Sequence, residues 1–417
     1  MKKILILFLS VVLIASCSHS NDEPEVISSD RTVLAYFLTK DLSELQSNVV
    51  SIFEGLQKTK KASTALIYWD NKDYNSSVSV PSILKFTSDG NGNVNNISQI
   101  KYKEDLAKST NMFNLVIGYA DVVRQYSANQ QSTDKDVMTT VLKDMISLSS
   151  TKGYGLIFGS HSESWIPSPN VKLSSRAFAS AYENQLDIME LNEALINVSR
   201  KFDYILMDAC MMGNIEVVYE LQNTCNYFIA SPMEVPGIGF PYSTIMPDLF
   251  SDNVSDYTTN ICNAYSTYHA AEGHWGNCIA VKCSEVPALT NELNRYITSY
   301  SSPIDLSTVQ PYFSSTTNSG KYIGLSYDIL DFVNKLTSNT TPSSFKTQLK
   351  NTVVAKSFVT TSSVTGFPSF IGVDTNSLCG MGMYIPIASK STWNSYLKQL
   401  LWGDASGWSD YITNNNL

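Results

Sequence analysis

The cysteine at position 210 stands where a buried strand gives way to a helix. The stretch from residue 202 to residue 221 begins as an apolar run suited to a buried strand and ends with Ile215, Val218 and Tyr219 at helical spacing. The turn between them therefore falls near residues 211–214, directly after Cys210. A thiol just before a helix amino terminus feels the positive end of the helix dipole, which favours the nucleophilic thiolate. Free cysteine is also among the most buried residue types, so this stretch alone leaves a packing role open.

A histidine follows a second apolar run in the same way. Residues 153–160 have the composition of a strand that delivers His161 at its carboxyl end, and residues 187–200 have the periodicity of a connecting helix. Because the carboxyl ends of neighbouring parallel strands meet at one sheet edge, we expect His161 and Cys210 to lie together. Their separation is 210 minus 161, or 49 residues. An imidazole in such a pair takes the thiol proton, the thiolate attacks a carbonyl carbon, and the imidazolium protonates the leaving amine.

The elements that must position this pair predict an α/β fold. Residues 31–38 and 62–69 are β-rich and flank residues 42–58, whose apolar side chains recur at helical spacing. So short a β-α-β unit predicts two parallel strands with a right-handed crossover. We expect a mostly parallel central sheet with helices on both faces and small antiparallel additions. Asp70 ends the second strand at the edge where such sheets bind ligands, although a turn residue is the alternative role.

The remaining patterns extend this sheet. Residues 83–87 and 94–102 flank an Asp-Gly and an Asn-Gly pair and predict a hairpin, with turn chemistry favoured over a calcium loop because no glutamate closes the run. Further strands are expected at residues 227–230, 277–283, 369–373 and 380–387. Further helices are expected at residues 112–125, 136–148, 242–250, 257–271, 286–299, 322–336 and 392–401.

The amino terminus predicts export. Residues 1–17 join two lysines to an apolar run too short to anchor a folded protein in a bilayer, and the run closes with Leu-Ile-Ala-Ser-Cys. That ending resembles a bacterial lipobox, so Cys17 is expected to carry a lipid at the cell envelope, with the outer membrane favoured. A conventional signal peptide cut at the same small residues is the alternative. Residues 18–30 are polar and form a tether, which leaves residues 31–417 for the folded domain.

Composition excludes some classes of function. The 417 residues carry a formal net charge of -9 and only 16% charged residues, so no basic field is present to attract nucleic acid. Of seven cysteines, five remain if Cys17 is lipidated and Cys210 is catalytic, and an odd number argues against a complete disulfide framework. Cys278 and Cys283 are expected on opposite faces of one strand. The spacing of His269 and His274 is not that of a helical zinc site, so no metal is expected there.

These motifs resemble the clostripain family of cysteine peptidases. The resemblance runs from about residue 31 onward and is most specific at Asp-Ala-Cys-Met-Met, residues 208–212, with its following helix. The strand into His161 with Trp165 behind it, and the proline-rich loop at residues 230–237, also match. The family implies a caspase-like αβα sandwich, and caspases share the separation of about 50 residues between histidine and cysteine.

The resemblance also implies roles for particular residues. His161 becomes the catalytic histidine and Cys210 the nucleophile, while Asp208 lines the pocket for the residue before the scissile bond and implies cleavage after Arg or Lys. An aspartate two residues before Cys210 points to the same side of the strand, where a carboxylate pairs with guanidinium or ammonium. Glu234 and Asp70 are weaker candidates for the same acidic rim.

One position departs from the family pattern. The backbone N–H groups of Cys210 and of the residue after the histidine are expected to form the oxyanion hole. Family members commonly have glycine after the histidine, whereas this chain has Ser162. Serine keeps the N–H but disfavours a positive φ, so the hole would change if the backbone required one.

Other expectations follow from the family or from the amino terminus. Self-cleavage at a basic residue between the pair is expected, with Lys172 and Arg176 as candidates. No cofactor is required, and calcium is left open without assigned ligands. Protein or peptide substrates with basic residues, a monomer and membrane attachment through the lipid complete this interpretation. Two rivals remain: a surface lipoprotein that keeps the fold and binds peptide without cutting it, and a cysteine hydrolase of other amide bonds.

Overall fold

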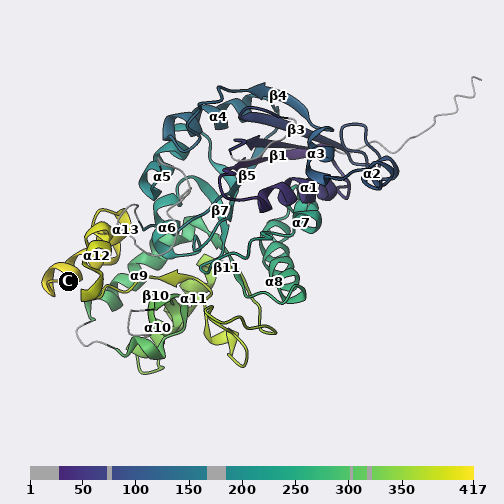
Figure 1. Ribbon diagram of the computed structural model, residues 1–417. Coiled ribbons are helices and arrows are strands. Elements are labelled where there is room, and N and C mark those ends of the chain that lie inside the picture. Colours follow the sequence, from purple (N-terminus) through teal and green to yellow (C-terminus); the bar gives the residue numbers. More distant parts are fainter. Residues whose placement is uncertain (1–27, 73–77, 167–184, 301–303, 317–321) are drawn as a thin grey trace, which may run out of the picture.

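The computed structural model describes residues 28–72, 78–166, 185–300, 304–316 and 322–417. Within these residues nine strands form one sheet, in the order β11-β8-β7-β6-β5-β1-β2-β3-β4 (Figure 1). Its five central strands are parallel and have the bounds β1 Ser28–Phe37, β2 Ala62–Trp69, β5 Gly153–Gly159, β6 Phe202–Asp208 and β7 Cys225–Ala230. Antiparallel strands close both sides, namely β3 Ser82–Asp89, β4 Asp121–Gln125, β8 Asn277–Lys282 and β11 Val353–Phe358.

Two helical layers cover the sheet, which makes the αβα sandwich expected from the sequence (Figure 1). One layer contains α1 Glu44–Leu56, α3 Met112–Ile117, α7 Tyr242–Leu249 and α8 Ile261–Ala271. The opposite layer contains α4 Lys135–Ser147, α5 Ile188–Asn197, α6 Ile215–Leu221 and α9 Val286–Thr298. The central strands are apolar on both faces because a parallel sheet between two helical layers is buried on both sides.

Local signals fix the ends of the helices that connect these strands. Asp187 begins α5 with a capping box, since it accepts from the Glu190 amide at 2.8 Å while the Glu190 side chain accepts from the Asp187 amide at 3.1 Å. Asp134 caps α4 in the same position, where its carboxylate accepts from the amides of Asp136 and Val137. These caps lie where the sequence pattern predicts the start of each helix.

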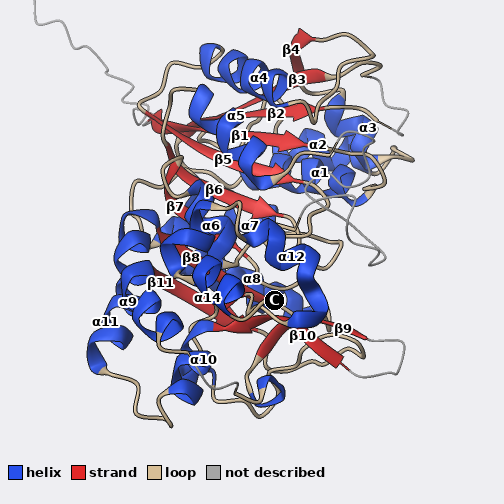
Figure 2. Cartoon of the chain, turned by 90° about the vertical axis from the view of Figure 1, so that its left-hand side faces the viewer, coloured by secondary structure: helices blue, strands red, loops and turns tan. Residues whose placement is uncertain are grey.

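The carboxyl-terminal part adds a small antiparallel sheet and five helices in the described residues (Figure 2). The sheet has the order β12-β10-β9, with β9 Pro311–Thr316, β10 Tyr322–Asp328 and β12 Gly382–Met383. The helices are α10 Ile329–Leu336, α11 Ser343–Thr352, α12 Ser391–Leu397, α13 Leu401–Ser406 and α14 Trp408–Asn414. None of the helices in the described ranges is long and apolar enough to cross a membrane.

The expected hairpin at residues 83–102 is wrong in its second half. The Asp89 carboxylate accepts from the amides of Asn91 and Asn93 and forms the expected turn, but only Val94 bridges back to β3. Asn95 and Asn96 then take positive φ values of 47° and 64°, which turn the chain away from the sheet. The chain continues as helix α2, Gln99–Leu106, capped by the side chain of Ser98.

Three other expected elements are also corrected. The helix expected at residues 112–125 ends at Ile117, and the β-branched pair at 122–123 belongs to β4, which pairs with β3. The helix expected at residues 322–336 is β10 followed by α10, with Asp328 capping the helix through the Asp331 amide at 2.9 Å. Residues 369–373 form no strand, and Gly372 has a φ of 74° there. Only Gly382–Met383 is paired within residues 380–387.

Candidate active site

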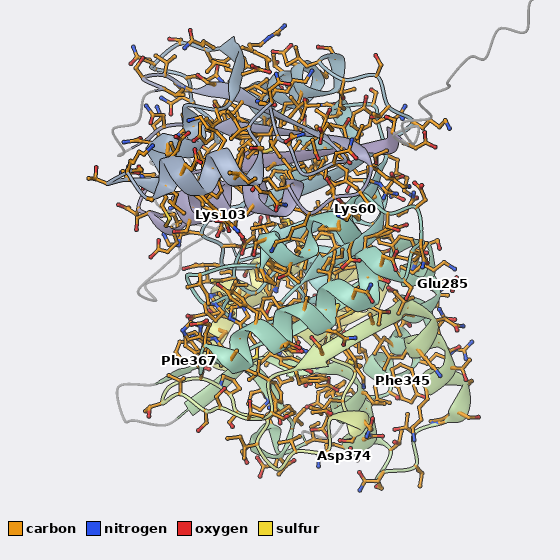
Figure 3. The ribbon with its side chains drawn as sticks, turned by 90° about the vertical axis from the view of Figure 1, so that its right-hand side faces the viewer. Lys60, Lys103, Glu285, Phe345, Phe367 and Asp374 are labelled. Atoms are coloured by element: carbon orange, nitrogen blue, oxygen red, sulfur yellow. The ribbon has the colours of Figure 1, made fainter. Side chains whose placement is uncertain are left out.

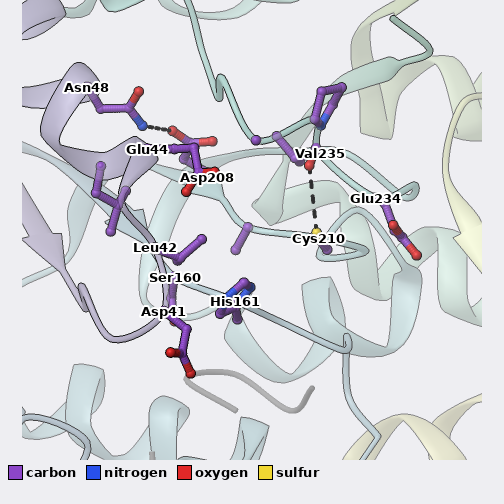
Figure 4. A pocket seen from close by; sticks show the side chains of 14 residues that line it. Asp41, Leu42, Glu44, Asn48, Ser160, His161, Asp208, Cys210, Glu234 and Val235 are labelled. Carbon is purple, nitrogen blue, oxygen red and sulfur yellow. Dashed lines mark hydrogen bonds between the residues drawn. The ribbon is translucent and has the colours of Figure 1, made fainter. Parts of the chain in front are cut away.

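His161 and Cys210 leave the sheet at the same edge. Strands β5 and β6 are adjacent and parallel, and Gly159 lies opposite Asp208 at their carboxyl ends. Both side chains line one cavity of about 260 Å³ between this edge and the start of α1. Figure 4 shows the His161 ring and the Cys210 sulfur on neighbouring parts of its wall. The structure thus brings together the two residues that the sequence pairs.

The turn that carries Cys210 is held by the loop after β7. Met211 has a φ of 59°, and its amide donates to the Met233 carbonyl at 2.8 Å. The Gly213 amide donates to the Ser231 carbonyl at 2.8 Å, and a Cβ at Gly213 would lie 2.5 Å from the Pro232 nitrogen. A side chain therefore cannot be placed at 213 without moving the loop. This sharp turn directs the partly exposed Cys210 thiol into the cavity, 3.9 Å from the Val235 carbonyl oxygen.

The histidine loop does not require glycine after His161. Ser162 is absent from the residues with positive φ in the described ranges, whereas Ser164 two positions later has a φ of 65°. The Ser162 hydroxyl donates to the Met212 sulfur at 2.8 Å and accepts from the Ser164 amide at 3.2 Å. The serine therefore joins the histidine loop to the Cys210 turn, residues 210–214, and its backbone is compatible with a side chain. The Ser162 amide has no acceptor among the described residues.

Asn214 also joins these two loops, and it was missed by the sequence reasoning. Its side-chain amide donates to the Met211 carbonyl at 2.6 Å and to the Ser164 hydroxyl at 3.1 Å. Its oxygen accepts from the hydroxyl of Ser326 in β10. Asn214 is 3% exposed, so these bonds replace water rather than compete with it. Its place as the residue before a helix is the only sequence signal, and that signal suggests a cap rather than this cross-link.

Asp208 places a carboxyl group at the floor of the cavity and is 7% exposed. Its Oδ2 atom accepts from the Tyr242 hydroxyl at 2.8 Å, from Asn48 Nδ2 at 3.0 Å and from the Phe240 amide at 3.4 Å. Burial raises the pKa of Asp208 from 3.8 to about 6, although the bonds from Tyr242 and Phe240 oppose that rise. No described donor reaches Oδ1, so this oxygen is available to a ligand.

The loop that supplies Tyr242 fits closely around this carboxylate. Gly239 has a φ of 65°, and a Cβ there would lie 2.6 Å from Asp208 Oδ2 and 2.9 Å from Asn48 Nδ2. Only glycine combines this left-handed conformation with so close an approach. The loop after β7 therefore positions both the Cys210 turn and the Asp208 carboxyl group.

Carboxylates predominate among the charged groups of the cavity. Asp208 and Glu234 are joined in its lining by Asp41 and Glu44, and no Lys or Arg is among the described residues that line it. Asp41 and Glu44 were missed by the sequence reasoning, although they follow β1, whose carboxyl end lies at the same edge. In Figure 4 the Glu234 carboxylate lies beyond Cys210 on the side away from Asp208.

Asp70 does not reach this cavity, which corrects its expected place on the acidic rim. It is fully buried, and its Oδ1 accepts from the Thr39 hydroxyl at 2.6 Å and from the Thr39 amide at 3.0 Å. Asp70 thus links the ends of β1 and β2. Its carboxylate satisfies buried backbone and hydroxyl donors there instead of facing a ligand.

Other candidate residues are resolved in part. Cys17, Lys172 and Arg176 lie outside the described residues. Six cysteines are free in the described ranges, with the Cys225 and Cys283 sulfurs 3.6 Å apart and with Cys278 in the opposite core cluster, as the strand pattern predicts. No group of three metal-binding side chains occurs in the described ranges. His269 is fully buried, and burial together with nearby His274 lowers its pKa to about 3.

A cysteine and a histidine at the carboxyl ends of neighbouring parallel strands, within an αβα sandwich, are the arrangement expected of a caspase-like cysteine peptidase. The family model of the clostripain peptidases matches residues 26–414. The chain therefore belongs to the clostripain family of cysteine proteases. No curated protein matches it.

Solved structures of this family share the fold. A secreted cysteine protease of the family from Bacteroides thetaiotaomicron, in complex with an irreversible peptide inhibitor, is 26% identical with a TM-score of 0.67. The match covers 91% of this chain and 99% of that one. An inactive zymogen from Parabacteroides distasonis is 22% identical with a TM-score of 0.68, covering 91% of this chain and 98% of that one.

Proposed function

We propose that the protein is a cysteine endopeptidase that cleaves peptide bonds after Arg or Lys, with Cys210 as nucleophile and His161 as general acid and base. The observation that carries this proposal is the single cavity in which both residues lie with four carboxylates and without a Lys or Arg in its described lining. A positively charged side chain is the complement of such a lining. A guanidinium or ammonium would pair with Oδ1 of Asp208, which precedes the proposed nucleophile by two residues.

The chemistry proceeds through a thioester. His161 takes the Cys210 proton, the thiolate forms a bond to the scissile carbonyl carbon, and the carbonyl oxygen becomes an oxyanion. The amides of Ser162 and Cys210 are the proposed oxyanion donors, which agrees with the absence of a described acceptor for the Ser162 amide. The C–N bond then breaks as the His161 imidazolium protonates the leaving amine. Water activated by His161 hydrolyses the thioester and returns the thiol.

Peptide pairs that differ only in charge test this proposal. We expect turnover of a fluorogenic peptide with Arg at the cleavage position and little turnover of the same peptide with citrulline, its neutral isostere. Cys210→Ala and His161→Ala should each abolish turnover under reducing conditions. Equal cleavage of the Arg and citrulline peptides would refute the specificity, and turnover that survives Cys210→Ala would refute the nucleophile. Parallel assays with calcium and with a chelator determine whether calcium is needed.

Alkylation gives a control that does not depend on the substrate. Cys210 is the one partly exposed cysteine among the six described, because the other five are buried. Brief iodoacetamide treatment should therefore modify Cys210 before the buried thiols, and mass spectrometry of the peptides locates the adduct. Loss of activity in proportion to this adduct supports the proposed nucleophile.

Self-processing at Lys172 or Arg176 is the proposed route of activation, by the family resemblance. Purified wild type should be cut between His161 and Cys210, whereas Cys210→Ala and the double variant Lys172→Ala/Arg176→Ala should stay intact. A wild-type chain that remains in one piece while it cleaves substrate would contradict this proposal.

A lipid anchor at Cys17 is the proposed means of attachment to the cell envelope. We expect expressed protein to incorporate labelled palmitate and to sediment with membranes, and Cys17→Ser to do neither. The folded domain, which begins with β1 at Ser28 and not at residue 31 as expected, would then act as a monomeric peptidase at the end of a tether, with protein or peptide substrates. Release of the wild type as unlabelled soluble protein would favour a conventional signal peptide.

A further inference from the structure

A second and larger cavity lies at β11, the strand at one end of the sheet, away from the acidic cavity. It measures about 700 Å³ and is enclosed by β11, α10, α11 and the loop at residues 376–379. It shares no lining residue with the cavity of Cys210. Strands β7 and β8 lie between β6 and β11, which places the two sheet positions about 14 Å apart at a strand spacing of about 4.8 Å. Cavities that hold small ligands measure about 300–1,000 Å³.

The charged lining of this second cavity is cationic. Lys346, Lys350 and Lys356 line it, and no Asp or Glu does among the described residues. This is the reverse of the protein as a whole, whose formal net charge is -9. None of the three lysines forms an ion pair with a described carboxylate. The cavity therefore presents positive charge that the described part of the chain does not neutralise.

Two of the three lysines share a helix face, and the third is held in place by backbone carbonyls. Lys346 and Lys350 are separated by one helical turn on α11 and therefore share a face. The Lys356 ammonium donates to the Thr375 carbonyl at 3.1 Å and to the Leu378 carbonyl, which fixes its position. An ammonium has three donors, so one N–H of Lys356 remains for a ligand.

The rest of the lining is largely apolar. Leu330, Leu349, Val353, Val354 and Leu378 belong to it, and Val354 is 37% exposed. An inorganic anion would leave this surface wet, whereas a hydrocarbon chain would cover it. A nucleic acid would require a broad basic surface, which the net charge of -9 does not provide.

We propose that this cavity binds an anionic amphiphile, that is, a carboxylate or phosphate head group on a hydrocarbon chain. The lysines hold the head group and the leucines and valines hold the chain. This site is independent of the proposed peptidase activity, because its residues take no part in the cavity of Cys210.

Calorimetric titration of the full folded chain tests the proposal with four probes. Decanoate and decyl phosphate carry both parts of the proposed ligand, and the stronger binder of the two identifies the head group. Decanol lacks the charge and inorganic phosphate lacks the chain. We expect decanol and inorganic phosphate each to bind at least about tenfold more weakly than the better amphiphile, because each lacks one of the two contacts.

Matched variants assign that binding to this cavity. The double variant Lys346→Gln/Lys350→Gln should weaken binding of the better amphiphile by about tenfold or more, because each substitution removes a charge-assisted contact. Lys103→Gln/Lys108→Gln removes the same charge from exposed lysines in and after α2, and it should leave the dissociation constant unchanged. Figure 3 shows Lys103 in the upper part of the molecule, far from Phe345 of α11 and Asp374 below. Circular dichroism verifies that both variants fold.

Three outcomes would overturn the proposal. One is the absence of measurable binding of either amphiphile below its micellar concentration. Another is decanol or inorganic phosphate binding as tightly as the better amphiphile. The third is an equal loss of affinity in the two double variants, which would assign the effect to net charge rather than to this cavity.

Discussion

Asp208→Asn should impair cleavage after Arg while it stabilises the protein. Asparagine is nearly isosteric, and its side-chain oxygen can accept the three bonds that Asp208 Oδ2 accepts from Asn48, Phe240 and Tyr242. The substitution therefore removes the charge and keeps the local packing. Because the charge is what a cationic substrate needs and what burial penalises, the two effects have opposite signs.

The shifted pKa of Asp208 gives the size of the stability effect. Its pKa rises from 3.8 to about 6 on folding, mainly through burial. The folded protein thus holds a proton that the unfolded chain releases between these values, and wild-type stability falls as the pH rises through this window. A rise of about two units corresponds to about 3 kcal/mol. Asp208→Asn should be more stable by about this amount at pH 7.5, and the difference should vanish below about pH 4.

The size of the activity effect follows from the lost charge pair. Removal of one partner of a buried, hydrogen-bonded charge pair costs about 2–5 kcal/mol, which lowers kcat/KM for an Arg peptide by about 30- to 5,000-fold. The citrulline peptide carries no charge, so the variant should cleave it at the same low rate at which the wild type cleaves it. Urea unfolding at pH 4 and 7.5, together with kcat/KM for both peptides, measures both effects. Equal losses for Arg and citrulline, or lower stability at pH 7.5, would refute the role of Asp208 as a buried charge that binds substrate.

Two further substitutions test how this site is positioned. Tyr242→Phe removes a hydrogen bond that lowers the pKa of Asp208, so the pKa of Asp208 should rise above its value of about 6. Binding of an Arg peptide to the inactive Cys210→Ala protein, titrated against pH, should show the shift, and an unchanged midpoint would contradict it. Asn214→Ala should lower kcat about 10- to 100-fold with KM within about twofold, because it loosens the Cys210 turn and leaves the charge in the acidic cavity intact. A change confined to KM would refute that positioning role.

The centre of the fold could be predicted from the sequence because its signals are local. Strand β2 was predicted with the bounds that it has, and the other parallel strands were located within a few residues. Strands buried on both faces are continuous apolar runs, and polar caps such as Asp187 end the neighbouring helices. His161 and Cys210 could be paired for the same reason, since each directly follows such a run.

The edges of the fold could not be predicted because their strands depend on distant partners. In β11 polar and apolar residues are mixed, and it forms a strand because it pairs with β8, which precedes it by about 70 residues. The short β12 pairs with β10 and forms one further bridge, from Gly382 to Asn214. Loop contacts are equally non-local. Asp41 and Glu44 reach the cavity because β1 ends there, and Asn214 is held in part by Ser326, which the distant β10 supplies.

The carboxyl-terminal additions are a structural part of the candidate active site. The Gly382 amide of β12 donates to the Gly213 carbonyl at 3.2 Å, which joins the small sheet to the Cys210 turn. The buried carboxylate of Glu216 in α6 accepts from the Tyr384 amide at 2.6 Å, and burial raises its pKa to about 8.

Such a carboxyl group is costly to bury and would lose its partner if the small sheet left. Helix α6, which follows the Cys210 turn, is thus suited to packing against the carboxyl-terminal segment that contains Tyr384. A shortened protein that ends after β11 would leave the Glu216 carboxyl group without Tyr384 and the Gly213 carbonyl without Gly382, so both the fold and the geometry of the Cys210 turn depend on residues far along the chain.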